Sequence, residues 1–394
     1  MLDTFKTASI AYAPGNPHPG RAAHDVITAE RFEAARREIT TWFGYAPTPL
    51  VELNALASQL SVASIMYKDE GPRFGLGSFK ALGGAYAVLK VLHREVEKAT
   101  GHAVPMADVA GGKHAAIAAQ TTVISATDGN HGRSVAWGAQ RFGMPCHIYI
   151  HAEVSEERAE AMRSLGANVT RIDGDYDASV ALTRKEGEEN GWFIVSDTSW
   201  PGYTETPSEV MAGYGVMTHE INQQLDRAPT HVFLQGGVGG LAASVTAALR
   251  QHWGGDTPKI VVVEPDLAPC LLMSARAGEA TVAVIEEETL MAGLSCGEPS
   301  KLAWAILEQE ASDFLAIPES VVGPSVRLMA RPFEGDQPLE AGESAIAGLA
   351  GFICAATQRQ LREKIGLDEN SRVLLIGSEG VTDRSLFNQL MAEG

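Results

Sequence analysis

The strongest constraint on the fold is the way in which short apolar runs alternate with helix-like stretches along the chain. Runs rich in β-branched residues are expected to form strands, and these are Ser64–Lys68, Thr122–Ala126, Cys146–His151, Asn168–Asp173, Trp192–Asp197, His231–Gln235, Lys259–Glu264 and Arg372–Ile376. Helix-like apolar spacing lies between them, at Glu156–Leu165, Leu241–Trp253 and Gly342–Lys364. Because strands that alternate with helices pair in parallel, the pattern predicts an α/β fold with mainly parallel sheets.

The length of the chain and its lack of linkers bear on domain organisation. A chain of 394 residues exceeds the usual size of one domain, yet it contains no long Pro/Gly/Ser-rich linker. If the chain forms two lobes, it therefore crosses between them through short connections. Residues 101–113 contain Pro105, Gly111 and Gly112 without a clear period, so we expect an irregular surface segment there.

Charge and targeting signals exclude several classes of partner. The 49 acidic and 31 basic residues give a formal net charge of -18, which repels nucleic acid and anionic membranes. Residues 1–10 have no apolar core of signal-peptide length, and no later run approaches a membrane span. These observations favour a cytoplasmic protein.

The cysteines give no sign of a metal site. Cys146, Cys270, Cys296 and Cys354 are spread along the chain without CxxC spacing, so neither zinc nor a disulfide framework is indicated. Cys270 and Cys296 both lie beside expected loops and could meet, but buried thiols are the better interpretation.

The first candidate for chemistry is a lysine that follows a glycine-rich loop. Residues 68–80 read KDEGPRFGLGSFK, and a helix-like stretch, Ala81–Leu92, comes directly after Lys80. The positive end of a helix and partial burial favour the neutral amine that Schiff-base formation requires. On its own, this position is more typical of a solvated lysine at a helix end, because surface lysines are common.

The second candidate is the loop Gln235–Gly240, which reads QGGVGG between an apolar run and a helix-like stretch. Its glycines allow successive backbone N–H groups to converge on a phosphate at a helix N-terminus. A dinucleotide site has a similar loop, with an acidic residue at the end of the next strand, and Glu264 stands there. A nicotinamide-dependent oxidoreductase and a non-catalytic ligand-binding protein thus stay open as alternatives.

The third candidate is the loop at residues 126–133, which reads ATDGNHGR between an expected strand and a helix. Its N–H groups are suited to a carboxylate, and the Asn130 amide to a phenolic oxygen. Asp128 could simply cap the helix, and His131 could simply hydrogen-bond at its start.

Taken in this order, the three motifs resemble the tryptophan-synthase-like (fold type II) family of pyridoxal 5'-phosphate enzymes. The resemblance implies two open, twisted, mainly parallel sheets flanked by helices, with a small domain inserted in a large one. It implies that Lys80 carries the cofactor and that Ser378, in the stretch GSEG at residues 377–380, faces the pyridine nitrogen. The cofactor phosphate is then held by Gly236, Gly237, Val238, Gly239 and Gly240, and the substrate carboxylate and ring by Thr127, Asp128, Gly129, Asn130 and His131.

Within this family, residues 126–133, 197–203 and 291–299 are similar to the ammonia-lyases that cleave 2,3-diaminopropionate. The implied reaction is an α,β-elimination that passes through an aminoacrylate and yields pyruvate and two ammonia, as in amino-acid degradation. Serine and threonine dehydratases of the family usually carry a small residue in place of Asp128. A threonine/serine or D-serine dehydratase remains the alternative within the family.

A second amino group on the substrate explains why carboxylates belong in such a site. Asp128 and Asp197 supply negative charge near the distal ammonium, which a neutral site would leave unpaired at a cost of about 1–3 kcal/mol. Asp197 ends an expected strand at the sheet edge where ligands of α/β proteins bind, although it could also only cap a turn.

The resemblance further implies that Lys80 and Asp128 act as catalytic bases on opposite faces of Cα, Lys80 for the L-isomer and Asp128 for the D-isomer. It also implies a homodimer. The expected domains are a large one, residues 1–88 and 203–394, and a small one, residues 89–202, with Lys80, Asn130 and Ser378 around the cofactor ring.

Overall fold

The structure is a computed structural model that describes residues 1–127, 129–174 and 176–393. The chain forms two compact units. The first consists of Met1–Ala29, Pro47–Ser78 and Met217–Gly394, and the second of Glu30–Ala46 and Phe79–Val216. The domain limits expected from the sequence, at 88/89 and 202/203, stay a prediction that limited proteolysis would test.

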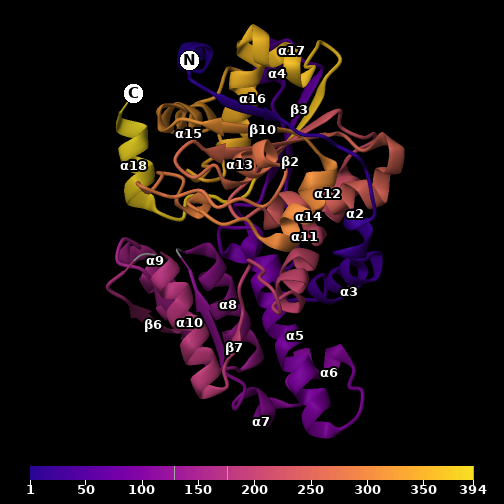
Figure 1. The fold of residues 1–394 in the computed structure, drawn as a ribbon, viewed down its shortest axis with the longest axis vertical. Helices are drawn as coiled ribbons and strands as arrows, with labels where there is room; N and C mark the ends of the chain where they lie inside the picture. The colour runs from indigo at the N-terminus through magenta and orange to yellow at the C-terminus, as the bar shows by residue number, and fades with distance from the viewer. Residues whose placement is uncertain (128, 175, 394) are drawn as a thin grey trace. The chain divides into compact units, whose positions relative to one another are not determined.

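The first unit is built on a seven-stranded sheet with the order β1-β10-β9-β8-β11-β3-β2. Figure 1 labels its strands β2, β3 and β10. Its strands are β1 (Ala11–Pro14), β2 (Leu50–Glu52), β3 (Ser64–Asp69), β8 (His231–Gln235), β9 (Lys259–Pro265), β10 (Ala311–Ile317) and β11 (Arg372–Gly377). Strands β10, β9, β8, β11 and β3 run parallel, whereas β1 and β2 pair antiparallel at the two edges. Strands β8, β9, β10 and β11 are almost wholly buried, which explains their runs of Val, Ile, Leu and Phe.

Helices cover this sheet and bury its apolar faces. They are α1 (Asp3–Thr7), α2 (Ala22–Asp25), α4 (Asn54–Leu60), α12 (Gly240–Trp253), α13 (Cys270–Ala277), α14 (Lys301–Glu310), α15 (Val322–Ala330), α16 (Ala347–Thr357), α17 (Arg359–Ile365) and α18 (Arg384–Ala392). Short 3-10 turns lie at η1 (Arg73–Gly75), η2 (Gly254–Asp256), η3 (Ala292–Leu294) and η4 (Glu319–Val321). Helix α16 is apolar all round because it packs across β8, β9, β10 and β11 and is itself covered by other helices.

The second unit is built on a four-stranded parallel sheet with the order β6-β5-β4-β7. Its strands are β4 (Val123–Ala126), β5 (Cys146–Ile150), β6 (Asn168–Arg171) and β7 (Phe193–Ile194). Its helices are α3 (Ala29–Ile39), α5 (Lys80–Thr100), α6 (Met106–Ala110), α7 (Ala115–Ala118), α8 (Asn130–Phe142), α9 (Glu156–Arg163), α10 (Tyr176–Asn190) and α11 (Glu205–Gln224), whose last residues belong to the first unit.

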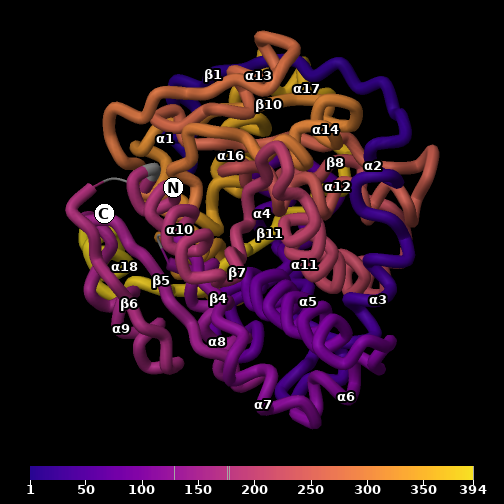
Figure 2. The backbone as a smooth tube through the Cα atoms, turned by 60° about the horizontal axis from the view of Figure 1, so that its bottom comes forward, coloured from indigo at the N-terminus to yellow at the C-terminus, as the bar shows by residue number. Residues whose placement is uncertain are grey.

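Helices α5 and α8 pack closely against each other (Figure 2). A Cβ on Gly84 would lie 1.7 Å from the Ser134 Oγ, and one on Gly138 would lie 2.7 Å from the Ala85 Cα. Glycine at these two positions therefore allows the helix that begins at Lys80 to lie directly on the helix that begins at Asn130.

The α/β fold with mainly parallel sheets is confirmed, but several expected elements are wrong in extent. The expected strand Trp192–Asp197 is reduced to Phe193–Ile194, because only these residues pair with β4. The expected helix Gly342–Lys364 begins only at Ala347 and is broken at Gln358, which adopts an extended backbone. Residues 101–113 are less irregular than expected, since they contain α6.

Strands β1, β2 and β10 were absent from the sequence expectation. The first two are short edge strands of four and three residues. Strand β10 follows α14 with no turn residue between Glu310 and Ala311. Nothing in the sequence therefore marks the change from the helical spacing of apolar residues to that of a strand. Among the described residues, none of the helices combines the length and apolar character needed to span a bilayer.

Candidate active site

Three loops of the first unit leave the same edge of its sheet. Strands β8, β11 and β3 are neighbours and run parallel, so the segments that follow them meet at one carboxyl edge. These segments are the glycine loop 236–240, residues 378–380 and the loop 70–78 that leads to Lys80. Ligands of open α/β sheets bind at this edge, so it is the expected place for a cofactor.

The glycine loop is shaped to receive an anion. Gly237 and Gly239 have φ angles of 59° and 93°, which favour glycine, and a Cβ on Gly236 would lie 2.4 Å from the Glu264 Cγ. Among the described residues, the amides of Gly237, Val238 and Gly240 have no protein acceptor. Since the loop opens α12, these amides lie at the positive end of a helix dipole and fit a phosphate group.

Glu264 is the acidic residue whose position made a dinucleotide site an alternative interpretation. It is buried beneath this loop. Its two oxygens accept hydrogen bonds from the amides of Leu271 and Leu272 at 2.9 and 2.8 Å, at the start of α13. Burial raises the pKa of Glu264 to about 8, against the opposing effect of these amides and of the Cys270 thiol. Because both oxygens are taken by α13, the carboxyl group is not available to a ribose, and the nicotinamide alternative loses its acidic residue.

Ser378 follows β11 and is buried. Its hydroxyl makes no hydrogen bond within the part of the chain that the structure describes. The next residue, Glu379, is fixed by a backbone bridge to Ser78 and by the Ser344 amide at 3.2 Å. A buried hydroxyl on a well-held backbone suits a ring nitrogen as hydrogen-bond partner.

In the second unit, Lys80 forms an ion pair with Asp197. The Lys80 ammonium contacts the Asp197 Oδ2, and the two side chains are 21% and 13% exposed. The His131 Nδ1 lies 3.8 Å from the same oxygen, while its Nε2 lies 2.9 Å from the Val195 carbonyl and must donate to it. Burial alone would raise the pKa of Asp197, but Lys80 and His131 hold it well below its usual range. Asp197 is therefore a permanently ionised carboxylate that faces cations.

The loop that precedes α8 lies beside Asp197 in the sheet order, because β4 and β7 are parallel neighbours. The Thr127 Oγ1 accepts hydrogen bonds from the amides of Gly129 and Gly132, both at 3.0 Å, and so fixes the start of α8 at Asn130. Asp128, the expected second carboxylate, lies outside the described residues.

Two tyrosines beside this site were not identified from the sequence as parts of it. The Tyr214 ring, on α11, packs on Phe79 with 4.6 Å between ring centroids. Burial raises the pKa of Tyr214, and the nearby Lys80 ammonium opposes that rise. The Tyr203 hydroxyl donates to the Ile194 carbonyl at 2.8 Å and accepts from the Ser196 amide at 3.0 Å, which holds the segment before Asp197. No sequence signal marks Tyr214, whereas Tyr203 lies in the motif 197–203.

Cys146, Cys270 and Cys354 are buried and Cys296 is partly exposed. No disulfide joins them in the described part of the chain.

Comparison with known proteins gives one consistent family. A family model of pyridoxal-phosphate dependent enzymes matches residues 41–379. The chain is 38% identical over 362 residues to the diaminopropionate ammonia-lyase of Escherichia coli, a match that covers 89% of this chain and 88% of that protein. The corresponding protein of Salmonella typhimurium is 36% identical over 368 residues, with 89% of each chain covered. The crystal structure of the Escherichia coli enzyme in complex with an aminoacrylate-PLP azomethine reaction intermediate has a TM-score of 0.89 and 33% identity, covering 98% of both chains.

Proposed function

The chain belongs to the pyridoxal-phosphate dependent enzymes, and from that premise we propose that it eliminates ammonia from 2,3-diaminopropionate, giving pyruvate and two ammonia. The observation that carries the choice of substrate is the ionised Asp197 carboxylate, which the Lys80 ammonium contacts. The two relatives compared above support the same substrate, since their names give diaminopropionate.

The residues of the first unit fit the cofactor. The amides of Gly237, Val238 and Gly240 would hold its phosphate, with Gly236 and Gly239 shaping the loop, and the Ser378 hydroxyl would face its ring nitrogen. Lys80 would carry it covalently, and Asn130 would bind its phenolic oxygen. When bound, pyridoxal phosphate supplies an electron sink for the charge left on Cα after proton removal.

Asp197 explains why a diamine fits better than serine. With Lys80 attached to the cofactor or freed as a neutral amine, Asp197 would lose the ammonium that balances its charge, and the distal ammonium of 2,3-diaminopropionate would take that place. Held by Asp197, the amine stays protonated and leaves Cβ as neutral ammonia. Serine would offer only a hydroxyl, which leaves the buried carboxylate without its main cation, at a cost of about 1–3 kcal/mol. Thr127, Gly129 and His131 would bind the substrate carboxylate and orient Asp197.

The stoichiometry of the products tests the proposal. We expect two ammonia for each pyruvate formed from 2,3-diaminopropionate, and a kcat/KM at least about 100-fold lower with serine or threonine, in line with the loss of one buried charge pair. Faster turnover of L-serine, L-threonine or D-serine than of the diamine would identify a dehydratase instead.

We also propose two bases. The freed Lys80 amine would take the Cα proton of the L-isomer, and Asp128 that of the D-isomer. Asp128→Asn should then lose turnover of D-diaminopropionate by about 100-fold or more while turnover of the L-isomer falls less than about threefold. Equal losses with both isomers, in a variant that keeps its cofactor absorption, would mean that Asp128 only balances the distal ammonium.

The working form is proposed to be a cytoplasmic homodimer, on the strength of the family resemblance. Sedimentation velocity at micromolar protein concentration should give twice the monomer mass of 41.9 kDa. A single species at the monomer mass would exclude the dimer.

A further inference from the structure

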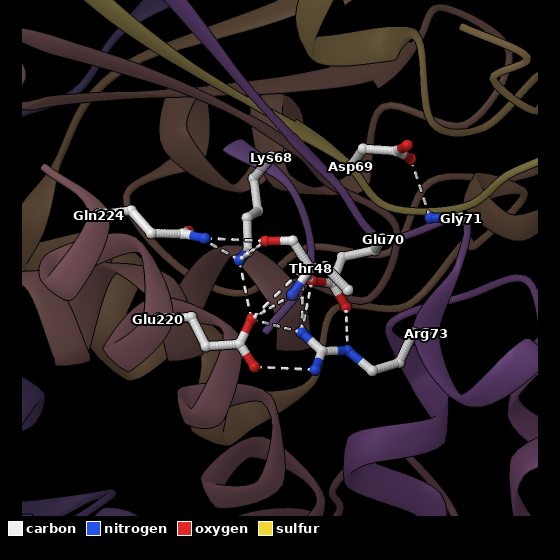
Figure 3. A network of polar contacts seen from close by, with 8 residues as sticks. All are labelled: Thr48, Lys68, Asp69, Glu70, Gly71, Arg73, Glu220 and Gln224. Carbon is white, nitrogen blue, oxygen red and sulfur yellow. Dashed lines mark hydrogen bonds and ion pairs between the residues drawn. The ribbon is translucent and has the colours of Figure 1, made fainter. Parts of the chain in front are cut away.

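A cluster of buried charges lies in the first unit, apart from the residues that would bind the cofactor (Figure 3). It comprises Lys68 at the end of β3, Glu70 and Arg73 in the loop that follows, and Glu220 on α11, with Thr48 and Gln224 beside them. All four charged side chains are at most 2% exposed. Two cations and two carboxylates leave the cluster formally neutral.

Each cation in the cluster uses its donors fully or nearly so. The Lys68 ammonium donates to the Thr48 carbonyl at 2.8 Å, to Glu220 at 2.8 Å and to Gln224 at 3.0 Å. The Arg73 guanidinium forms a fork with each glutamate, with distances of 2.7 and 2.8 Å to Glu70 and 2.8 Å twice to Glu220. Such two-pronged pairs fix orientation as well as distance. Glu220 therefore holds α11 against the loop in one register.

The cluster lies where the chain passes between its two units. These passages occur at 29/30, 46/47, 78/79 and 216/217. Thr48 follows directly on Pro47, Arg73 lies in the loop that ends at Ser78, and Glu220 lies in the helical turn that begins at Met217. Within the first unit, the hydrogen bonds of these charged groups thus connect the three segments that adjoin the points 46/47, 78/79 and 216/217.

The loop between Lys68 and Lys80 is held in a costly conformation. Phe74 has a φ of 51°, in the left-handed region that is unfavourable for residues with a side chain. The glycines on its C-terminal side, Gly75 and Gly77, have φ angles of 70° and 77°. Arg73, directly before Phe74, supplies the anchor that keeps this shape.

We propose that the Lys68–Glu70–Arg73–Glu220 cluster is a positioning device for Lys80. Arg73 anchors the loop that delivers Lys80, and Glu220 anchors α11. Along the same helix, about 9 Å from Glu220, Tyr214 packs on Phe79 beside Lys80. The segment before Lys80 therefore contacts α11 at two points, through Arg73 with Glu220 and through Phe79 with Tyr214. Lys80 directly follows the second of these contacts. The inference rests on the proposed role of Lys80 as the cofactor-bearing residue.

The test compares two buried glutamates in the complete protein, loaded with cofactor. Glu220→Gln removes one charge from the cluster, and Glu310→Gln removes the same charge from the Arg250–Glu310 pair, where the distance is 2.7 Å and Glu310 is 0% exposed. Both variants should lower the thermal midpoint. Only Glu220→Gln should lower kcat, by about tenfold with KM nearly unchanged, since a small misplacement of a reacting group suffices for that. Equal kcat losses in the two variants, or a normal kcat in Glu220→Gln, would overturn the proposal.

A second readout does not depend on the substrate. In cofactor-free protein, hydrogen–deuterium exchange of residues 69–79 should rise at least about threefold in Glu220→Gln and stay unchanged in Glu310→Gln. Unchanged exchange in both would refute the anchor even if diaminopropionate proved to be the wrong substrate. Should Glu220→Gln fail to fold, Thr48→Val takes its place, because it removes the hydroxyl that accepts from Arg73 at 3.1 Å and leaves the charges balanced. We then expect a smaller loss of kcat, about threefold, and the same local rise in exchange.

Discussion

Two buried lysine–carboxylate pairs in this protein have opposite character. The Lys68 side chain is 0% exposed, and its ammonium donates to three oxygens, one of them of Glu220. The Lys80 side chain is 21% exposed and contacts Asp197, which is 13% exposed. The first lysine is held by three protein acceptors and is closed to solvent, whereas the second is partly exposed.

With Lys80 as the proposed cofactor-bearing residue, the comparison implies that burial beside a carboxylate does not by itself make a lysine reactive. Removing Lys68 from Glu220 would leave an uncompensated buried charge, which typically costs about 3–5 kcal/mol. Removing the Lys80 ammonium from Asp197 leaves a carboxylate that a substrate cation can reach. We infer that a structural lysine has all its N–H donors bound to protein acceptors. A reactive lysine instead pairs with a carboxylate that can form an ion pair with a ligand cation.

The largest effect should come from Lys80. We expect Lys80→Ala to lose turnover by about three orders of magnitude or more, together with the visible absorption of bound cofactor, because both the attachment point and a base disappear. Borohydride reduction of the wild-type holoenzyme followed by peptide mapping should place the pyridoxyl group on Lys80. A pyridoxyl group on Lys68 would mean that the fully buried lysine is the reactive one, which would contradict this comparison.

The second effect concerns the partner of Lys80. Asp197→Asn should reduce kcat/KM for 2,3-diaminopropionate by about 100-fold and that for serine by less than about fivefold, because only the diamine brings a cation to this site. Parallel steady-state assays with both substrates give the ratio. If both substrates lose activity in the same proportion, Asp197 serves only to shape the turn in which it lies.

A third carboxyl, Glu264, sharpens the comparison because it is buried and no cation among the described residues shifts its pKa. Its pKa is raised to about 8, from an ordinary value of 4.5, whereas the pKa values of Asp197 and Glu220 are lowered by their cations. Between about pH 4.5 and 8 the folded protein holds a proton that the unfolded chain has released, so this stabilisation is full below that window and lost across it. The slope is at most about 1.4 kcal/mol per pH unit.

Glu264→Gln keeps the shape of the side chain without the titrating proton. Relative to this variant, the wild type should therefore lose stability as the pH rises from about 5 to about 8, measured by urea unfolding at each pH. A constant difference across the range would indicate that the Leu271 and Leu272 amides keep the carboxyl group ionised throughout.

The smallest effect should come from Lys90, which serves as a control because its side chain is nearly as exposed as that of Lys80. It lies on α5 like Lys80, its side chain is 23% exposed, and its ammonium is 3.7 Å from Glu209. Lys90→Met should change kcat less than about twofold and the free energy of unfolding by less than about 1 kcal/mol. A large loss of activity would mean that partly exposed lysines on α5 share the role assigned to Lys80.

The sequence revealed the parts of the site that are local. The Gly236–Gly240 loop and the segment before Lys80 each combine a strand, glycines and a helix within a few residues, so their pattern is visible without the fold. The partner of Arg73 on α11 could not be found this way, because Glu220 lies 147 residues away and an isolated glutamate in a helix carries no signal. Strand β1 was missed for the same reason, since Tyr12 meets Asp313 across 301 residues.

The position of β11 in its sheet has a consequence for synthesis of the chain. This strand lies between β8 and β3, yet it is formed by residues 372–377. Until those residues leave the ribosome, β8 and β3 each expose an edge with unpaired N–H and C=O groups, a state that invites aggregation. The strands of the second sheet, between Val123 and Ile194, are all present much earlier. A nascent chain that stops short of β11 therefore lacks an interior strand of its larger sheet, and we expect such fragments to be substrates for chaperones and proteases.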